Sequence, residues 1–213
     1  MENHDVKQHS RRRLNDPTAA GGQVNRTDGW TIRGMRFDGV GRGPNADLAH
    51  NGSMLGLDLT QTSYLLLEDF SFMHFHTAIR MSGGDMSKGE FNGHPCMYNI
   101  FRQGNIGSVH TAVITNYSIT NRFHDLQIGN VVDGIVVDAS NQIDIENVAI
   151  EEFTGTAISV RSKHTDTVHI QDVFFSIGPV GISISEGPNS CLVQVCWRTN
   201  LARKCTTHLA HTH

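Results

Sequence analysis

Two short alternating pairs carry the side chains of this chain that are best suited to acid–base chemistry. Asp144 and Glu146 are separated by one residue, as are Arg122 and His124, and the two pairs lie 22 residues apart. Carboxylates held beside arginine and histidine could transfer protons to or from a sugar, and an arginine could neutralise the carboxylate of a uronate. We therefore take these four residues as the candidate catalytic group, with Asp144 and Glu146 as acid and base.

Three further side chains follow the same spacing and extend this group. Glu68 and Arg102 each precede a turn-type residue by one place, as His124 does, and His169 precedes one by three places, as Asp144 does. Side chains alternate across a strand, so positions one and three places before the turn share the outward face. We expect Glu68, Arg102 and His169 to bind substrate beside the catalytic group.

The same charges also have a purely structural interpretation. Opposite charges that face each other across neighbouring strands form ion pairs, and each pair stabilises a sheet by about 0.2–1 kcal/mol. Asp58 and Arg80 have the spacing of such a pair on another face. On this interpretation, which the sequence favours, the charged columns only fix the alignment of the strands.

No metal or cofactor site is predicted. His74 and His76 would lie on one side of an extended segment, at a spacing that suits zinc. A zinc site needs three or four protein ligands, and no third ligand can be identified near these two histidines.

A pattern that returns six times along the chain positions the charged residues. In each copy an apolar residue lies two places before a turn-type residue and another lies three places after it. The tightest copies are about 22 residues long. The turn-type residues of the copies are Gly34, Asp69, Gln103, Asp125, Asn147 and Asp172.

A second short block follows each turn: a small residue, then mostly apolar ones, as in Gly134–Val137 and Ala157–Val160. The segments are too short for helices and rich in Ile, Val and Phe, which is typical of strands. Copies stacked roughly 4.8 Å apart would merge their apolar columns into one core. We therefore predict an all-β fold, a single-stranded right-handed parallel β-helix of about six to seven coils. The leucine-rich-repeat consensus is absent, and propeller blades would be longer.

The turn-type residues suit sharp corners between strands. Asp, Asn and Gly tolerate a left-handed backbone at modest cost, and they occupy five of the six turn positions. Gln103 departs from this pattern, so we expect its corner to be built differently.

The chain of 213 residues is long enough for one solenoid core. We place the β-helix at 29–197, after a polar, flexible arm at 1–28 and before a basic, His-rich tail at 198–213. Loop insertions near 39–53 and 82–96 enlarge two adjacent coils and are candidate binding loops. Neither end resembles a solenoid cap, so we expect a fragment of a longer protein or an end covered by another chain.

Composition excludes several classes of partner. The formal charge of −4 disfavours nucleic acid, and no apolar run approaches the length of a membrane span. The N-terminal segment lacks the apolar core of a secretory signal. Four cysteines with no zinc-site spacing, in a chain with so large a core, do not indicate a disulfide framework. Leu66 and Ile100 are apolar at outward positions and form a small candidate partner surface.

The chain from Gly29 to about Trp197 resembles the pectate-lyase-like superfamily of parallel β-helices. The resemblance rests on segments such as Gly29–Phe37, Ile143–Ile150 and Gly134–Val137. Within that group the chain is most similar to the β-helical body of bacteriophage tailspikes and tail fibres. That resemblance implies a homotrimer of the virion tail or extracellular space that binds, and often cleaves, bacterial polysaccharide. The motifs of polygalacturonases and of true pectate lyases are absent, so the resemblance supplies no catalytic residue.

Three functional hypotheses follow from these observations. The first is recognition of bacterial surface polysaccharide, with depolymerisation as a lyase or glycoside hydrolase as a further hypothesis within it. The second is a non-catalytic structural or receptor-binding β-helix. The third is an internal piece of a secreted polysaccharide lyase or glycoside hydrolase.

Overall fold

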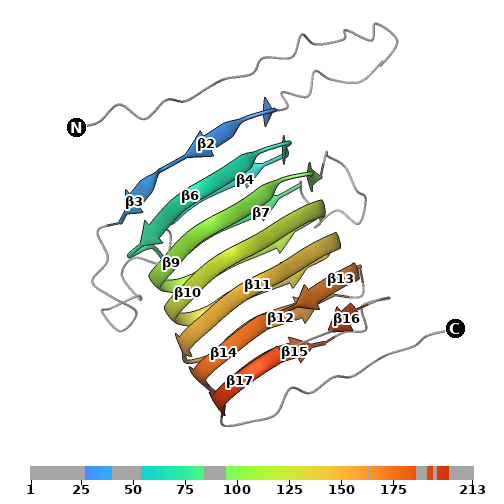
Figure 1. Ribbon diagram of the computed structural model, residues 1–213. Coiled ribbons are helices and arrows are strands. Elements are labelled where there is room, and N and C mark those ends of the chain that lie inside the picture. Colours follow the sequence, from blue (N-terminus) through green and yellow to red (C-terminus); the bar gives the residue numbers. More distant parts are fainter. Residues whose placement is uncertain are drawn as a thin grey trace, which may run out of the picture.

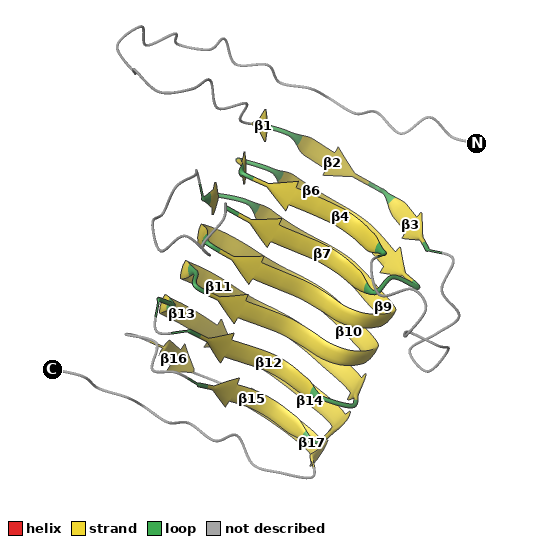
Figure 2. Ribbon diagram, turned by 180° about the vertical axis from the view of Figure 1, so that it is seen from behind, coloured by secondary structure: helices red, strands yellow, loops and turns green. Residues whose placement is uncertain are grey.

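The computed structural model describes residues 27–39, 54–83, 95–162, 164–185, 191–193 and 196–201. Within these ranges the chain forms seventeen strands of one continuous sheet and no helix. All the pairings between coils are parallel, and the sheet winds about one axis (Figures 1 and 2). The molecule is a right-handed parallel β-helix, which confirms the predicted fold class.

The coils have three flanks, each a column of strands. The first flank contains β2 (Thr31–Arg33), the first parts of β6 (Leu66–Met73), β9 (Ile100–Asn116), β10 (Ser118–Asp138) and β11 (Asn141–Phe153), then β13 (Asp166–Gln171) and β16 (Cys191–Val193). The second contains β3 (Arg36–Asp38), the later parts of β6, β9, β10 and β11, then β14 (Val173–Gly178) and β17 (Cys196–Leu201).

The third flank closes each coil. It contains β4 (Leu55–Thr60), β7 (Thr77–Ser82), the ends of β9 and β10, β12 (Thr156–Arg161) and β15 (Val180–Ile184). The short strands β1 (Thr27–Asp28), β5 (Thr62–Ser63) and β8 (Cys96–Met97) pair along the corner between the third and first flanks.

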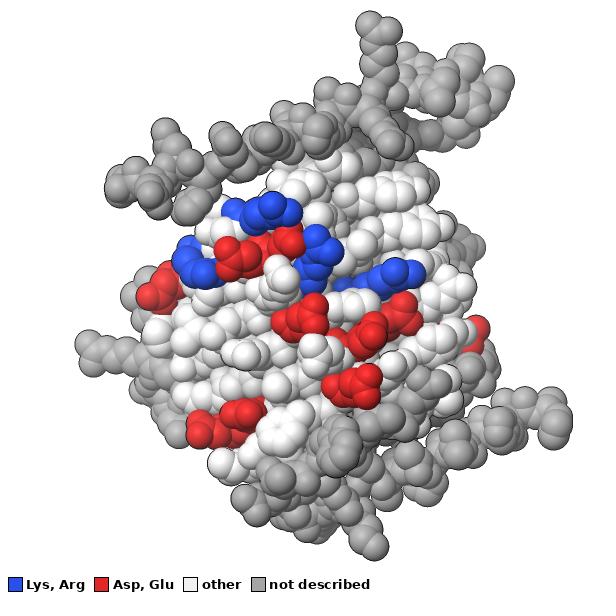
Figure 3. All heavy atoms as spheres, in the orientation of Figure 1, with Lys and Arg blue, Asp and Glu red and all other residues white. Residues whose placement is uncertain are grey.

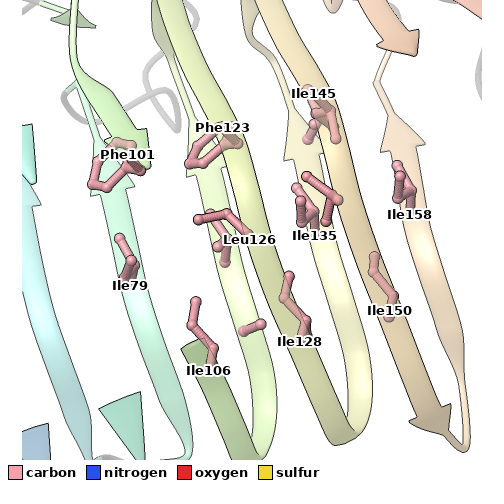
Figure 4. Packing of buried hydrophobic residues seen from close by; sticks show 14 of the residues in the cluster. Ile79, Phe101, Ile106, Phe123, Leu126, Ile128, Ile135, Ile145, Ile150 and Ile158 are labelled. Carbon is pink, nitrogen blue, oxygen red and sulfur yellow. The ribbon is translucent and has the colours of Figure 1, made fainter. Parts of the chain in front are cut away.

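Like residues stack over like inside the solenoid, as the repeat predicts. Ile128, Ile150 and Ile106 form one buried column, and the rings of Phe101 and Phe123 stack in another with centroids 5.1 Å apart (Figure 4). Burying a side chain of this size stabilises a fold by about 1.5–3 kcal/mol. The apolar columns therefore hold the coils in one register. The column that precedes the turn by two places has seven rungs: Ile32, Leu67, Phe101, Phe123, Ile145, Ile170 and Val193.

Every predicted turn residue adopts the left-handed backbone conformation. Asp69 has φ of 49° and Asp125 of 54°. The expectation of a different corner at Gln103 is wrong, since its φ of 55° matches the others. Additional left-handed corners lie five residues before and five after this column, at residues such as Tyr98 and Ile177. Hydrogen bonds between coils fix these corners, so side chains that disfavour a positive φ are tolerated there.

A pair of asparagines inside the solenoid was not predicted. Asn99 and Asn121 occupy inward positions of neighbouring coils and are fully buried. Asn99 Nδ2 donates to Asn121 Oδ1 at 2.9 Å, and Asn99 Oδ1 accepts from the backbone amide of Leu65 at 2.9 Å. These bonds satisfy backbone groups at the corner where the chain turns into the first flank.

The described strands extend from Thr27 to Leu201. Most of the predicted arm, tail and loop insertions lies outside the described residues, at 1–26, 40–53, 84–94 and 202–213. Within the described ranges, no helix is long and apolar enough to cross a membrane.

Candidate functional site

The first flank brings the predicted site residues together in two columns. Arg102, His124 and Glu146 are aligned one above the other, and a second column aligns Arg122 with Asp144. Glu68 precedes Arg102 in the first column, and His169 follows Asp144 in the second (residues 144 and 169 are partners in the ladder). The strands β6, β9, β10, β11 and β13 supply these residues. The sequence register therefore placed all seven candidates on one face.

Asp144 is held between an arginine and a histidine from the neighbouring coils. Its Oδ2 lies 3.4 Å from Arg122 Nε, and its Oδ1 lies 3.3 Å from His169 Nδ1. About a third of the Asp144 side chain is exposed, so both carboxylate oxygens remain near solvent. The geometry provides a carboxylate that two coils orient, at the surface where a polymer could reach it.

Glu146 has one partner in this ladder. Its Oε2 lies 3.2 Å from His124 Nδ1, and nearly half of its side chain is exposed. The other ring nitrogen of His124, Nε2, is buried and has no hydrogen-bond partner among the described residues. In this conformation His124 could exchange a proton with a ligand only through Nδ1, the atom that faces Glu146.

Glu68 is the most buried carboxylate of the group. It forms ion pairs with Arg33 and with Arg102, the latter at 2.7 Å, and only 8% of the residue is exposed. Arg102, whose side chain is 43% exposed, is thus more accessible to a ligand than Glu68. Glu68, in the preceding coil, orients that guanidinium group through the ion pair.

Figure 3 shows how charge is distributed over this face. Basic side chains lie over the N-terminal coils, interleaved with acidic ones, and acidic side chains continue alone toward the C-terminal coils. The ion pairs described above account for the mixed region. The predicted pair of Asp58 and Arg80 on the third flank is also present, with Arg80 Nε donating to Asp58 Oδ1 at 3.2 Å.

A stacked pair of tyrosines borders the charged columns and was missed in the sequence. The rings of Tyr64 and Tyr98 lie nearly parallel, with centroids 5.1 Å apart, and the residues are 55% and 45% exposed. Both occupy left-handed corners immediately before the first flank. The partly exposed Leu66 and Ile100, predicted as an outward apolar pair, lie two residues further on. The signal available in the sequence was the recurrence of tyrosine two places before each of those residues.

A polar groove of about 340 Å³ opens on the other side of the turn column, where the first flank meets the second. Its outward walls come from the column of Ser71, Asn105 and Gln127, aligned over one another in successive coils. The full lining is Arg36, Asp69, Phe70, Ser71, Gln103, Gly104, Asn105, Asp125 and Gln127. The groove depends on differences in side-chain length within one outward column. The pattern of polar and apolar residues therefore does not reveal it.

The described residues hold no group of three or more His, Cys, Asp or Glu placed to bind a metal ion. His74 pairs with Asp38, its Nδ1 lying 2.6 Å from Oδ1. His76 instead stacks on His110 of the next coil, with ring centroids 4.7 Å apart. Burial and the neighbouring His110 lower the pKa of His76 below its usual value. The predicted pair of histidines is thus divided between two separate contacts.

Comparison with known proteins yielded no relative. No protein-family model matches the chain, and neither a curated protein nor a solved structure is similar to it at a significant level.

Proposed function

We propose that this β-helix binds polysaccharide along its first flank, in the manner of the tailspike-like β-helices of bacterial viruses. The observation that carries the proposal is the exposed stack of Tyr64 and Tyr98 at the border of the charged columns. A flat aromatic surface accepts the C–H face of a pyranose ring, while nearby charged groups accept and donate hydrogen bonds to its hydroxyls. The flank offers both kinds of group side by side.

The spacing along each coil suits a short stretch of a polymer. In an extended strand, Ile100 lies about 7 Å and Arg102 about 13 Å beyond Tyr98, at roughly 3.3 Å per residue. A chain stacked on the tyrosines would thus cross the apolar pair Leu66 and Ile100 before it reaches the arginines. Leu66, Ile100 and Arg102 lie in strands, and the corners at Tyr64 and Tyr98 are fixed by backbone hydrogen bonds to the next coil. Little ordering of the backbone is therefore needed on binding.

The binding test uses immobilised bacterial capsular and exopolysaccharides and the double variant Tyr64→Ser/Tyr98→Ser. We expect the wild type to be retained on at least one polysaccharide and the double variant to lose at least tenfold in affinity. Ile177→Ser is the matched control, since Ile177 is 55% exposed and also occupies a left-handed corner, on a different edge of the coil. Equal loss in the control and the tyrosine variant, or no retention of the wild type, would refute the proposal.

Depolymerisation is a further step within this proposal. Asp144 and Glu146 would serve as acid and base, with Arg122 and His124 as their charged neighbours. Hydrolysis would release reducing ends, whereas β-elimination at a uronate would release unsaturated products, which absorb in the ultraviolet. We expect Asp144→Asn/Glu146→Gln to abolish product release while leaving binding intact. Activity that survives in this double variant would remove the catalytic assignment.

A specific observation favours the second candidate function, a non-catalytic receptor-binding β-helix. Asp144, Glu146 and Glu68 each contact a cation or histidine of a neighbouring coil, which is what alignment of the coils alone would require. Binding without any product release in the assay above would select this function.

The tailspike-like proposal also implies three associated chains in the virion tail or another extracellular setting. Light scattering in solution tests this directly, since one chain has a mass of 23.5 kDa. We expect about three times that value, and a monomer at micromolar concentration would contradict the trimer.

A further inference from the structure

We propose that the polar groove beside the turn column is a subsite for a neutral, hydroxyl-rich sugar unit and that it disfavours acidic sugars. The inference rests on the proposed function, because the sugar unit belongs to the same polysaccharide that the first flank binds. It goes further in naming the chemical class of the unit and the residues that select it.

The groove adjoins the charged columns directly. Arg102 and His124 immediately precede the turn residues Gln103 and Asp125, which line the groove. A polymer that runs from the tyrosine stack across the arginines therefore reaches the groove next. The turn residues form the rim that separates the two regions of one continuous outer surface.

The shape of the groove follows from the lengths of side chains in one outward column. Short Ser71 and Asn105 lie between the longer Arg36 and Gln127, so the surface is hollowed over two coils. Phe70 and Gly104 complete the lining from inward positions. A Cβ at Gly104 would lie 2.2 Å from the ring of Phe70, which shows how closely that ring covers the glycine. The hollow therefore combines an apolar base with polar walls, as sugar subsites require.

The walls present planar groups that suit neighbouring hydroxyls. Amides of Gln103, Asn105 and Gln127 both donate and accept hydrogen bonds, while the carboxylates of Asp69 and Asp125 accept them. Asn147 Nδ2 donates to Asp125 Oδ1 at 2.5 Å and fixes that carboxylate. Two adjacent hydroxyls of a hexose can bond to one such planar group at the same time.

The charges of the lining select against acidic sugars. Among the lining residues the one cation is Arg36, and it donates to both the carbonyl oxygen and Oδ1 of Asp69, at 3.3 and 3.2 Å. Asp125 adds a second carboxylate. Because the Arg36–Asp69 pair is close to neutral, a uronate or sulfate in the groove would face the one uncompensated negative charge of Asp125. An uncharged unit meets no such repulsion.

The test measures binding to three polysaccharides. They are a neutral dextran, the polyuronate polygalacturonate, and the bacterial polysaccharide that retains the wild type in the binding test above. We expect Asn105→Ala/Gln127→Ala to weaken binding of that polysaccharide at least tenfold, with the melting temperature unchanged. Asp69→Asn/Asp125→Asn should raise affinity for polygalacturonate several-fold. Asn130→Gly is the matched control, since Asn130 is exposed outside the groove and bonds only to Ser108.

The outcomes separate this inference from the proposed function. Weakened binding in the tyrosine variant together with unchanged binding in the Asn105/Gln127 variant would overturn the subsite and leave flank recognition standing. Unchanged affinity of Asp69→Asn/Asp125→Asn for polygalacturonate would overturn the selectivity for neutral sugars. No retention of any polysaccharide would overturn both.

Discussion

The side-chain amide of Asn99 donates a hydrogen bond to Oδ1 of Asn121 in the next coil, in the interior of the solenoid. The same Oδ1 also accepts from the backbone amide of Asn99 at 2.9 Å, and Asn121 Nδ2 donates to the carbonyl oxygen of Cys96 at 3.0 Å. One buried side chain thus satisfies groups of its neighbouring coil at the corner that leads into the charged flank.

Removing this side chain should be costly. Asn121→Leu keeps the branching and the number of side-chain heavy atoms but leaves the backbone amide of Asn99 and the carbonyl of Cys96 without that partner, while Asn99 Nδ2 keeps its bond to the carbonyl oxygen of Thr62. Each unsatisfied buried group costs about 1–3 kcal/mol, so we expect a loss of about 3 kcal/mol or more in the free energy of unfolding. Urea denaturation measures it. The exposed Asn130→Gly should change stability by less than about 1 kcal/mol, and an equal loss in both variants would refute the role of the buried pair.

We expect a side chain at position 104 to be tolerated only when Phe70 is replaced by a smaller residue. In Gly104→Ala the new methyl would lie 2.2 Å from Cζ of Phe70, and overpacking of this kind costs about 1–3 kcal/mol. Phe70→Leu combined with Gly104→Ala should lose less than the sum of the two single losses. Gly129→Ala is the control, because its nearest neighbour would be 3.8 Å away. Additive losses in the double variant would contradict the contact.

The stacked imidazoles of His76 and His110 should make stability sensitive to acid. The folded-state pKa of His76 lies below its usual value of 6.5 because burial and His110 disfavour its charged form. Below about pH 6.5 the unfolded state therefore binds more protons than the folded state, and stability falls as the pH falls toward the folded-state pKa. Above that pH the contribution is constant.

The variant His76→Gln isolates this effect. Denaturation at pH 8 and pH 5.5 should show a smaller loss of stability on acidification in His76→Gln than in the wild type. Titrating groups away from the His76–His110 stack act equally in both proteins, so the difference belongs to this stack. An identical pH dependence in the two proteins would show that protonation of His76 does not oppose folding.

The ion pairs of the charged flank should differ in strength with burial. Asp144→Asn removes partly exposed pairs with Arg122 and His169, and we expect a loss below about 1 kcal/mol that shrinks further in high salt. Glu68→Gln removes a buried carboxylate between two arginines, and we expect a loss of about 1.5–3 kcal/mol. Thermal denaturation at low and high salt compares the two. A larger loss in Asp144→Asn would contradict this ranking.

The repeat could be predicted from the sequence because its signal lies in residue type at fixed spacing. Apolar residues such as Phe123 and Ile145 recur 22 places apart, and the structure pairs them in register. The same spacing places Arg122 over Asp144 without any knowledge of coordinates. Once the register is known, every outward column follows from the alternation of side chains.

The features that the sequence could not reveal depend on rotamers and on local corners. Tyr64 and Tyr98 occupy corners with positive φ, a conformation that tyrosine does not favour. Their residue type therefore did not predict that they lie at corners. Asn99 and Asn121 are polar at inward positions, where the apolar pattern alone predicts a hydrophobic residue. The groove arises from differences in side-chain length between neighbouring coils. The polar and apolar pattern of the repeat contains no information about those lengths.

A structure of the solenoid with an oligosaccharide cut from the retained polysaccharide would test the account most directly. We expect one sugar ring packed against the exposed side of the Tyr64–Tyr98 stack, with the chain crossing the columns of Arg102 and Arg122 toward the groove at Asn105. An oligosaccharide bound only on the third flank, or a chain that leaves both tyrosines uncovered, would contradict it.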